Sequence, residues 1–70
     1  MNDAKTLTAR QARVIPHLLA APSLEEGARR AGVIKVTVYE WLKQEVFRQE
    51  LKRQRDELIE RAVESIHRLS

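Results

Sequence analysis

The stretch from Glu45 to Ser70 contains neither glycine nor proline, and it restricts the possible folds of this chain more than any other feature. It is full of Glu, Arg, Leu and Ala, which have high helix propensity. The stretch therefore predicts one long helix that runs to about Leu69, with a break or a bend near Glu45. Because the chain has 70 residues, there is room for one small domain at most.

Shorter helices are predicted ahead of the long one. The first begins at Thr8, because Thr8 and Gln11 have the spacing of a capping box. Pro16 lies deep inside it, so we expect either a kink or a break at which Pro16 starts a new turn. Ser23 and Glu26 repeat the capping-box spacing and predict the start of a second helix. The first helix has an apolar stripe at helical spacing, made of Val14, Ile15, Leu18 and Leu19.

The second helix is expected from Leu24 to about Ala31. It ends at Gly32, because glycine adopts the left-handed conformation of a helix terminus without steric cost. A third helix then follows from Lys35 to about Gln44. Residues 33–39 are rich in β-branched side chains and, taken alone, favour a strand, but the chain offers no second strand to pair with it. The inward face of the third helix would carry Val38, Trp41 and Leu42.

These patterns predict an all-α fold in three parts. Residues 1–7 have no periodic apolar pattern and are expected to form a flexible arm. Residues 8–44 are predicted to form a three-helix core that contains a helix-turn-helix. Residues 45–70 are predicted to form a long amphipathic helix behind that core.

The charge of the chain is distributed unevenly between its two halves. Lys and Arg outnumber Asp and Glu by seven to four in residues 1–44, whereas residues 45–70 hold six basic and six acidic residues. The positive excess therefore lies in the half that holds the predicted helix-turn-helix, where an anionic partner would bind. The chain has no cysteine and no apolar run long enough for a signal peptide or a membrane span. We expect a cytoplasmic protein with no membrane partner.

The sequence carries no pattern typical of an enzyme or a metal site. His17 and His67 do not lie in a pattern typical of a catalytic site, and there is no glycine-rich phosphate loop. Glu57 and Glu64 have arginines at helical spacing and Glu60 is followed directly by Arg61, so we interpret Glu57, Glu60 and Glu64 as a solvated face. The prediction is a protein without catalytic activity, cofactor, metal or small-molecule substrate.

The segment around Gly32 meets three demands of a helix-turn-helix. Ala28 is a small residue where the two helices would cross, and Gly32 makes the turn. Val33, Val38 and Trp41 would hold the third helix against the core. In such a motif the exposed face of the second helix meets base edges in the major groove of double-stranded DNA.

This segment resembles the helix-turn-helix of small phage and transposable-element proteins, among them phage terminase small subunits and insertion-element proteins. The resemblance covers residues 18–58 and is carried by AGVIKVTVYEWLKQEVFRQEL. It implies DNA recognition for packaging, transposition or transcriptional regulation. Two positions depart from the family pattern: Ile34 stands where a capping residue is usual, and Gly27 where a larger residue is usual. We therefore expect a poorly capped third helix and a flexible point in the second.

The candidate DNA contacts follow from the predicted faces. Lys35 is expected to contact guanine, Val36 a thymine methyl group and Glu40 a cytosine amino group. For Lys43, a solvated charge without contact to DNA is an equally good interpretation. The full set of candidate base contacts is Lys35, Val36, Tyr39, Glu40 and Lys43, with Tyr39 also suited to a phosphate. The candidate phosphate contacts are Arg10, Arg13, Ser23 and Thr37.

The last helix carries an apolar stripe made of Leu58, Ile59, Ala62, Val63, Ile66 and Leu69. A helix of about 25 residues spans roughly 37 Å, which is longer than a three-helix domain needs. We therefore expect a homo-oligomer, either a dimer on repeated half-sites or a larger ring. The alternative is that the stripe packs back onto the first helix as core. The rival function is an adaptor that binds a protein partner and does not touch DNA.

Overall fold

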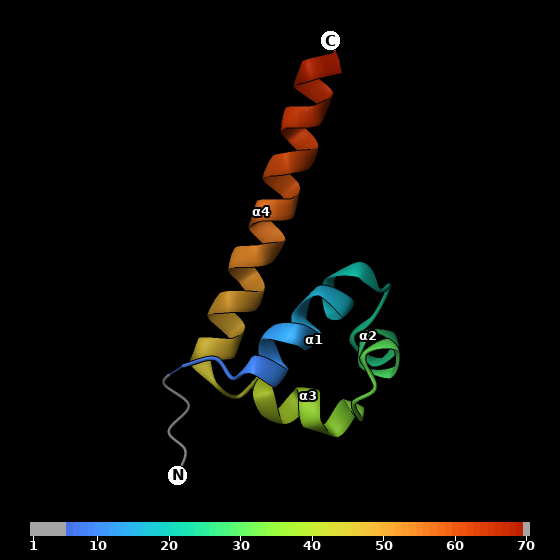
Figure 1. Cartoon of the computed structure of the whole chain (residues 1–70), viewed down its shortest axis with the longest axis vertical. Coiled ribbons are helices and arrows are strands. Elements are labelled where there is room, and N and C mark those ends of the chain that lie inside the picture. Colours follow the sequence, from blue (N-terminus) through green and yellow to red (C-terminus); the bar gives the residue numbers. More distant parts are fainter. Residues whose placement is uncertain (1–5, 70) are drawn as a thin grey trace.

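The computed structural model describes residues 6–69, except for the side chain of Leu69, and these residues form four α-helices (Figure 1). In chain order they are α1 (Ala9–Ala20), α2 (Leu24–Ala31), α3 (Lys35–Trp41) and α4 (Glu45–Leu69). The first three pack together at one end, and α4 rises away from them, so the molecule measures 50 × 25 × 17 Å. The predicted all-α fold with a long last helix is confirmed. Residues 1–5 of the predicted arm lie outside the described part.

Helix α1 begins as the sequence predicts. The Thr8 Oγ1 accepts a hydrogen bond from the Gln11 N–H at 3.1 Å, and the Gln11 Oε1 accepts one from the Thr8 N–H at 3.0 Å, which completes the capping box. The helix is continuous across Pro16, so the break that we expected as one alternative is wrong. Val14 and Leu18, on either side of the proline, are both buried, and their packing offsets the one backbone hydrogen bond that Pro16 lacks.

The turn between α2 and α3 is also as predicted. Gly32 has a φ of 78°, in the left-handed region, and ends α2. Its N–H donates to the carbonyl of Arg29 at 3.1 Å, and the N–H of Val33 donates to that of Ala28 at 2.9 Å. These two bonds satisfy carbonyls that the helix end would otherwise leave open. Val33 is buried directly after the turn, so the position of α3 is fixed from its start.

Helix α3 is shorter than predicted. It ends at Trp41, and residues 42–44 form a turn before α4 begins at Glu45. No glycine or proline marks this end, which is why the sequence pattern ran on to Gln44. The carbonyl of Leu42 accepts a hydrogen bond from the Arg48 Nη1 at 2.7 Å. At the amino end of α3, the Ile34 side chain makes no capping hydrogen bond, so the expectation of a poorly capped third helix is confirmed.

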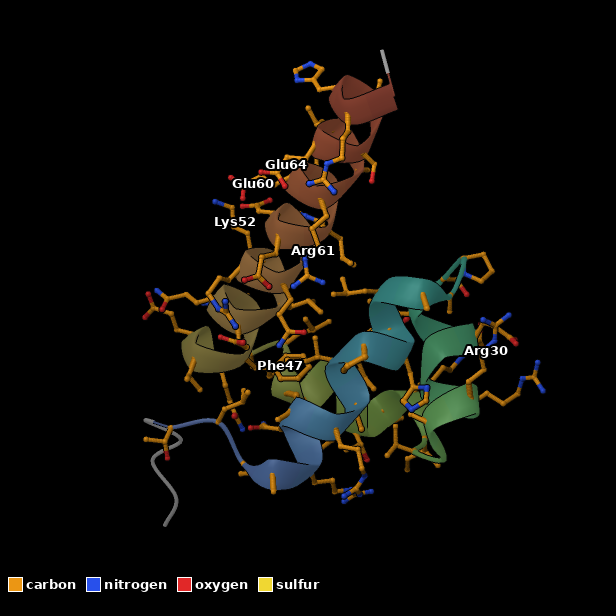
Figure 2. The ribbon with its side chains drawn as sticks, turned by 45° about the horizontal axis from the view of Figure 1, so that its top comes forward. Arg30, Phe47, Lys52, Glu60, Arg61 and Glu64 are labelled. Atoms are coloured by element: carbon orange, nitrogen blue, oxygen red, sulfur yellow. The ribbon has the colours of Figure 1, made fainter. Side chains whose placement is uncertain are left out.

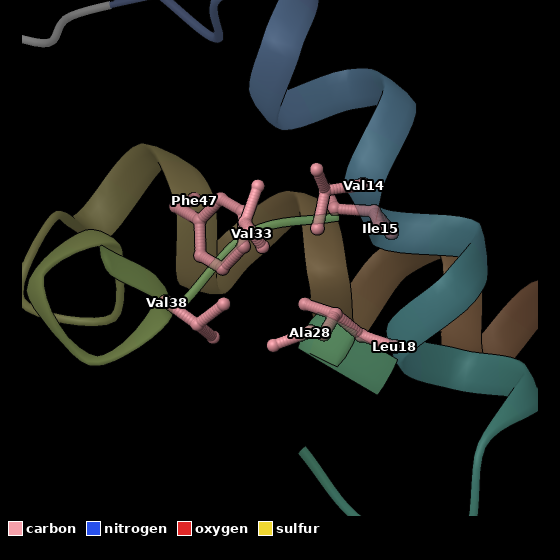
Figure 3. Close-up of a cluster of buried hydrophobic side chains, with 7 residues drawn as sticks. All are labelled: Val14, Ile15, Leu18, Ala28, Val33, Val38 and Phe47. Carbon is pink, nitrogen blue, oxygen red and sulfur yellow. The ribbon is translucent and has the colours of Figure 1, made fainter. Parts of the chain in front are cut away.

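The core lies where the three short helices meet the start of α4 (Figure 3). Phe47 of α4 is fully buried and is the largest side chain in that core. The ring of Trp41, which is half-buried, packs against it with 5.5 Å between centroids. The first turns of α4 are therefore part of the domain that positions α3. The buried apolar residues are Val14, Ile15, Leu18, Ala28, Val33, Val38 and Phe47.

Gly27 corrects one expectation. It is buried where α2 approaches α1, and a β-carbon there would lie 2.7 Å from the Cα of Leu18 and 3.0 Å from the carbonyl oxygen of His17. Both neighbours are backbone atoms, which cannot rotate away. Gly27 is therefore the residue that lets the two helices approach closely, and the expected flexible point is wrong. Ala28, which we expected at a helix crossing, is buried beside it in the core.

Candidate nucleic-acid interface

Helix α3 has two distinct faces. Val38 is buried in the core and Trp41 packs against it, so this side of the helix is held in place. The opposite side, here called the outer face, carries only exposed side chains, and α3 lies at the end of the molecule opposite the free end of α4 (Figure 1). All five candidate base contacts are exposed: Lys35, Val36, Tyr39 and Glu40 lie on the outer face, and Lys43 lies directly after α3 in the turn at residues 42–44.

Lys35 is not a free cation in this structure. Its Nζ lies 3.1 Å from the Glu25 Oε2, so α2 and α3 are joined by an ion pair across the turn. The hydrogen bond that Lys35 donates to the Glu25 carboxylate raises the pKa of Lys35 above its ordinary value, and Lys35 is therefore charged at neutral pH. Solvent screens this exposed pair, so a phosphate or a guanine could replace Glu25 at small cost.

Lys43 and Glu40 form a second pair on the outer face, with the Lys43 Nζ 3.2 Å from the Glu40 Oε2. The lysine reduces the repulsion that Glu40 would exert on a phosphate. Each lysine of the outer face is thus matched by a carboxylate. The positive potential needed to attract DNA must come chiefly from arginines at the edge of this face.

Arg10 is such an arginine. Its guanidinium lies over the ring of Trp41, 5.6 Å from the centroid, and this cation–π contact brings α1 next to the end of α3. Arg13 is exposed one turn further along α1. The structure therefore places Arg10 beside the carboxyl end of α3, on the side that carries Trp41.

The two hydroxyl candidates for phosphate contact have other surroundings. The Ser23 Oγ accepts the N–H of Glu26 at 3.2 Å and serves as the cap of α2. Thr37 is half-buried between the two faces of α3. Their hydroxyl groups are thus less available to an incoming phosphate than the guanidinium groups of Arg10 and Arg13.

Sequence reasoning missed two residues near the outer face. Ile34, at the start of α3, is 69 % exposed, the highest value among the exposed large apolar side chains. Arg48 of α4 places a cation at the carboxyl end of α3 through the hydrogen bond that it donates to the Leu42 carbonyl. The sequence does contain a signal for Ile34, because a large apolar residue is unusual at the position that caps a helix. Nothing in the local pattern points to Arg48, because its role depends on the turn between α3 and α4.

The apolar stripe of α4 is exposed rather than packed on α1. Ile59 is 56 % exposed and Ile66 is 64 % exposed, and Leu58, Ala62 and Val63 are also exposed. The alternative in which the stripe packs onto the first helix as core is therefore wrong for these residues. The side chain of Leu69, the last predicted member of the stripe, lies outside the described part.

Within residues 6–69 there is no group of three His, Cys, Asp or Glu side chains that could hold a metal ion, and no helix there is both long and apolar enough to cross a membrane. Comparisons with protein-family models, curated proteins and solved structures each found no match.

Proposed function

We propose that this chain binds double-stranded DNA through the outer face of α3, as a helix-turn-helix protein of phage or mobile-element type. The observation that carries the proposal is the division of α3 into a face held by the core and a face that is fully exposed. Gly32 and Val33 fix the angle at which α3 leaves α2. A helix of about 10–12 Å diameter held in this way fits a major groove about 12 Å wide.

The outer face has the chemistry to read bases. Lys35 can donate to the O6 and N7 of guanine, and Glu40 can accept from the N4 of cytosine. Val36 can contact the methyl group of thymine. Both charged groups must first exchange their present partners, so base contacts form at the expense of two exposed ion pairs. Arg10 and Arg13 would contact phosphates and set the register of α3 in the groove.

We also propose that the chain acts as a homo-oligomer through the apolar stripe of α4. The outer face of one copy carries lysines that are already paired, so one copy alone would hold DNA weakly. Two or more copies on one duplex multiply that affinity without new contacts. The exposed stripe at Ile59 and Ile66 is the surface that supports this association.

An adaptor function is the second candidate, and one observation favours it. Val36 and Tyr39 are large and exposed one turn apart on α3, and Ile34 is exposed just before it, and exposed apolar side chains of this kind also suit a groove on a protein partner. The test is binding of the whole chain to a random-sequence duplex between about 50 and 200 mM salt. DNA binding predicts an affinity that falls linearly on a log–log plot against salt. No binding at the lowest salt would favour the adaptor.

A further inference from the structure

We infer that Arg10 of α1 and Arg48 of α4 together bind phosphate groups of DNA at the carboxyl end of α3, and we call this pair the phosphate clamp. The inference rests on the proposed binding of duplex DNA. It adds to that proposal a contact from α4, which is not part of the outer face of α3. Three properties of the two guanidinium groups support it: where they lie, which N–H donors they leave open, and how their charges are matched.

Both guanidinium groups lie against consecutive residues at the end of α3. The Arg10 guanidinium is 5.6 Å from the centroid of the Trp41 ring, and the Arg48 Nη1 donates to the carbonyl of Leu42 at 2.7 Å. The two arginines come from the first turns of α1 and α4, which meet beside the end of α3 although they are far apart in the sequence (Figure 1). Each cation is thus held at this end by a contact of its own.

These contacts leave most of the N–H donors open. Within residues 6–69, Arg10 makes no hydrogen bond through its guanidinium, and Arg48 makes one. A guanidinium carries five N–H donors in one plane, in a geometry that suits two oxygens of a phosphate. A side chain that is already held in place also loses less conformational freedom when it binds. Arg10 and Arg48 are therefore oriented in advance and still able to donate to phosphates.

The charges of the clamp are not matched by carboxylates. Within residues 6–69, neither arginine belongs to an ion pair, whereas Lys35 and Lys43 both do. The acidic residues that flank this end of α3 in the sequence have other partners: Glu40 is paired with Lys43 at 3.2 Å, and Glu45 accepts from Gln49 at 2.9 Å. A phosphate at either lysine must first displace a carboxylate. A phosphate at the clamp displaces none.

The position of the clamp suits a strand that borders the major groove. A helix that enters the groove has the phosphates of the bordering strands within reach of its ends, and such contacts fix its register. Arg48 is the first cation of α4, and beyond it the helix rises away from α3 (Figure 1). The clamp would therefore fix the carboxyl end of α3 against one strand, while the rest of α4 stays clear of the duplex.

The salt dependence of duplex binding tests the clamp, because each neutralised phosphate adds about 0.9 to the slope of log affinity against log salt. The variants are Arg10→Gln, Arg48→Gln, Arg48→Lys and the double variant with glutamine at both positions. The matched control is Arg61→Gln. Arg61 also belongs to no ion pair within residues 6–69, and it lies roughly 20 Å further along α4 than Arg48. Fluorescence anisotropy of the whole chain on a random-sequence duplex gives the slope.

We expect Arg10→Gln and Arg48→Gln each to reduce the slope by about 0.9 per bound chain, and the double variant by about 1.8. At about 100 mM salt, one lost contact corresponds to a roughly eightfold loss of affinity. The loss should be the same on duplexes of different sequence, because a phosphate contact carries no base information. Arg48→Lys should keep the slope because it keeps the charge, and Arg61→Gln should match the unmodified chain.

Several results would overturn the clamp. A lower affinity with an unchanged slope in Arg48→Gln would mean that Arg48 only holds the end of α3 through Leu42. Equal slopes in Arg48→Gln and Arg61→Gln would mean that the position of the charge does not matter. If circular dichroism shows that Arg48→Gln loses helicity, the test rests on the other two variants, and an unchanged slope in Arg10→Gln or a reduced slope in Arg48→Lys overturns the clamp. If the unmodified chain binds no duplex at low salt, the proposed function itself fails, which is distinct from binding with unchanged slopes.

Discussion

A β-carbon placed on Gly27 of α2 would stand 2.7 Å from the Cα of Leu18 of α1, closer than two such atoms are found in proteins. The two helices that support α3 therefore meet backbone to backbone at this point. The position is buried, and no side chain rotation can make room there. The packing of α1 on α2 thus depends on the absence of a side chain at residue 27.

Gly27→Ala should destabilise the fold even though alanine is the better helix former. The change gains up to about 1 kcal/mol of helix propensity, but forcing α1 and α2 apart costs about 1–3 kcal/mol. We expect a net loss of roughly 1 kcal/mol in the free energy of unfolding, measured by urea denaturation. An increase in stability would contradict the close approach of the helices.

The matched control is Gly32→Ala. No atom lies within 4 Å of a β-carbon built at Gly32, so any cost there comes from its φ of 78° and not from crowding. We expect a loss of about 1–2 kcal/mol. Gly32→Asn should lose less, because asparagine tolerates the left-handed region. At residue 27, by contrast, asparagine should be worse than alanine.

The Gln11–Gln44 bond ties α1 to the turn before α4. The Gln11 Nε2 donates to the Gln44 Oε1 at 3.0 Å, and Gln11 is almost fully buried. Gln11→Ala and Gln44→Ala should each cost about 1–3 kcal/mol, because the first empties a buried site and the second leaves the buried Gln11 amide without its acceptor. In a double-mutant cycle the two changes should be coupled by about 1 kcal/mol. Full additivity would mean that the bond does not form in solution.

The interaction between Glu50 and Arg53 predicts that the fold loses stability in acid. Hydrogen bonds from Arg53 and then Gln54 lower the pKa of Glu50 from 4.5 to about 2. Because the pKa is depressed in the folded state, the stabilisation is present above about pH 4.5 and is lost as the pH falls toward 2. The exposed pair contributes at most about 1 kcal/mol, or roughly 4–8 °C in Tm. The Tm difference between the unmodified chain and Glu50→Gln should shrink between pH 6 and pH 2.5; a constant difference would argue against this pair.

Much of the local structure was predictable because its causes lie within a few residues. Thr8 with Gln11 marks one helix start, and Gly32 marks one helix end. The inward positions Val38 and Trp41 also predict which face of α3 is exposed. Each of these features depends on capping, on backbone conformation or on helical period, and all three can be read from short stretches of sequence.

What the sequence could not reveal depends on contacts between distant segments. Phe47 is the centre of the core only because the turn at residues 42–44 folds α4 back toward α1. From the sequence alone, Gly27 only lowers the helix propensity of α2, and its role in close packing depends on the path of α1 beside it. Lys35 was expected to be available for DNA, and its pairing with Glu25 forms across the α2–α3 turn, between residues ten positions apart.

The pairing of Lys35 with Glu25 itself predicts an effect on DNA binding. Glu25→Gln removes a carboxylate beside the outer face and leaves Lys35 without its competing partner. We expect the affinity for duplex DNA to rise by about two- to fivefold at low salt, with a smaller rise at high salt because of screening. Fluorescence anisotropy on a labelled duplex measures this. A fall in affinity would mean that Glu25 positions Lys35 rather than competing for it.

The most direct test compares two lysines of the same chain. Lys35→Ala removes a cation from the outer face of α3, whereas Lys52→Ala removes one from the exposed side of α4 (Figure 2). If α3 enters the groove, Lys35→Ala should weaken duplex binding by about 1–3 kcal/mol, roughly 5- to 150-fold. Lys52→Ala should stay within about twofold, and both variants should keep full helicity. Equal losses in the two variants, or no loss in either, would contradict DNA binding by the outer face of α3.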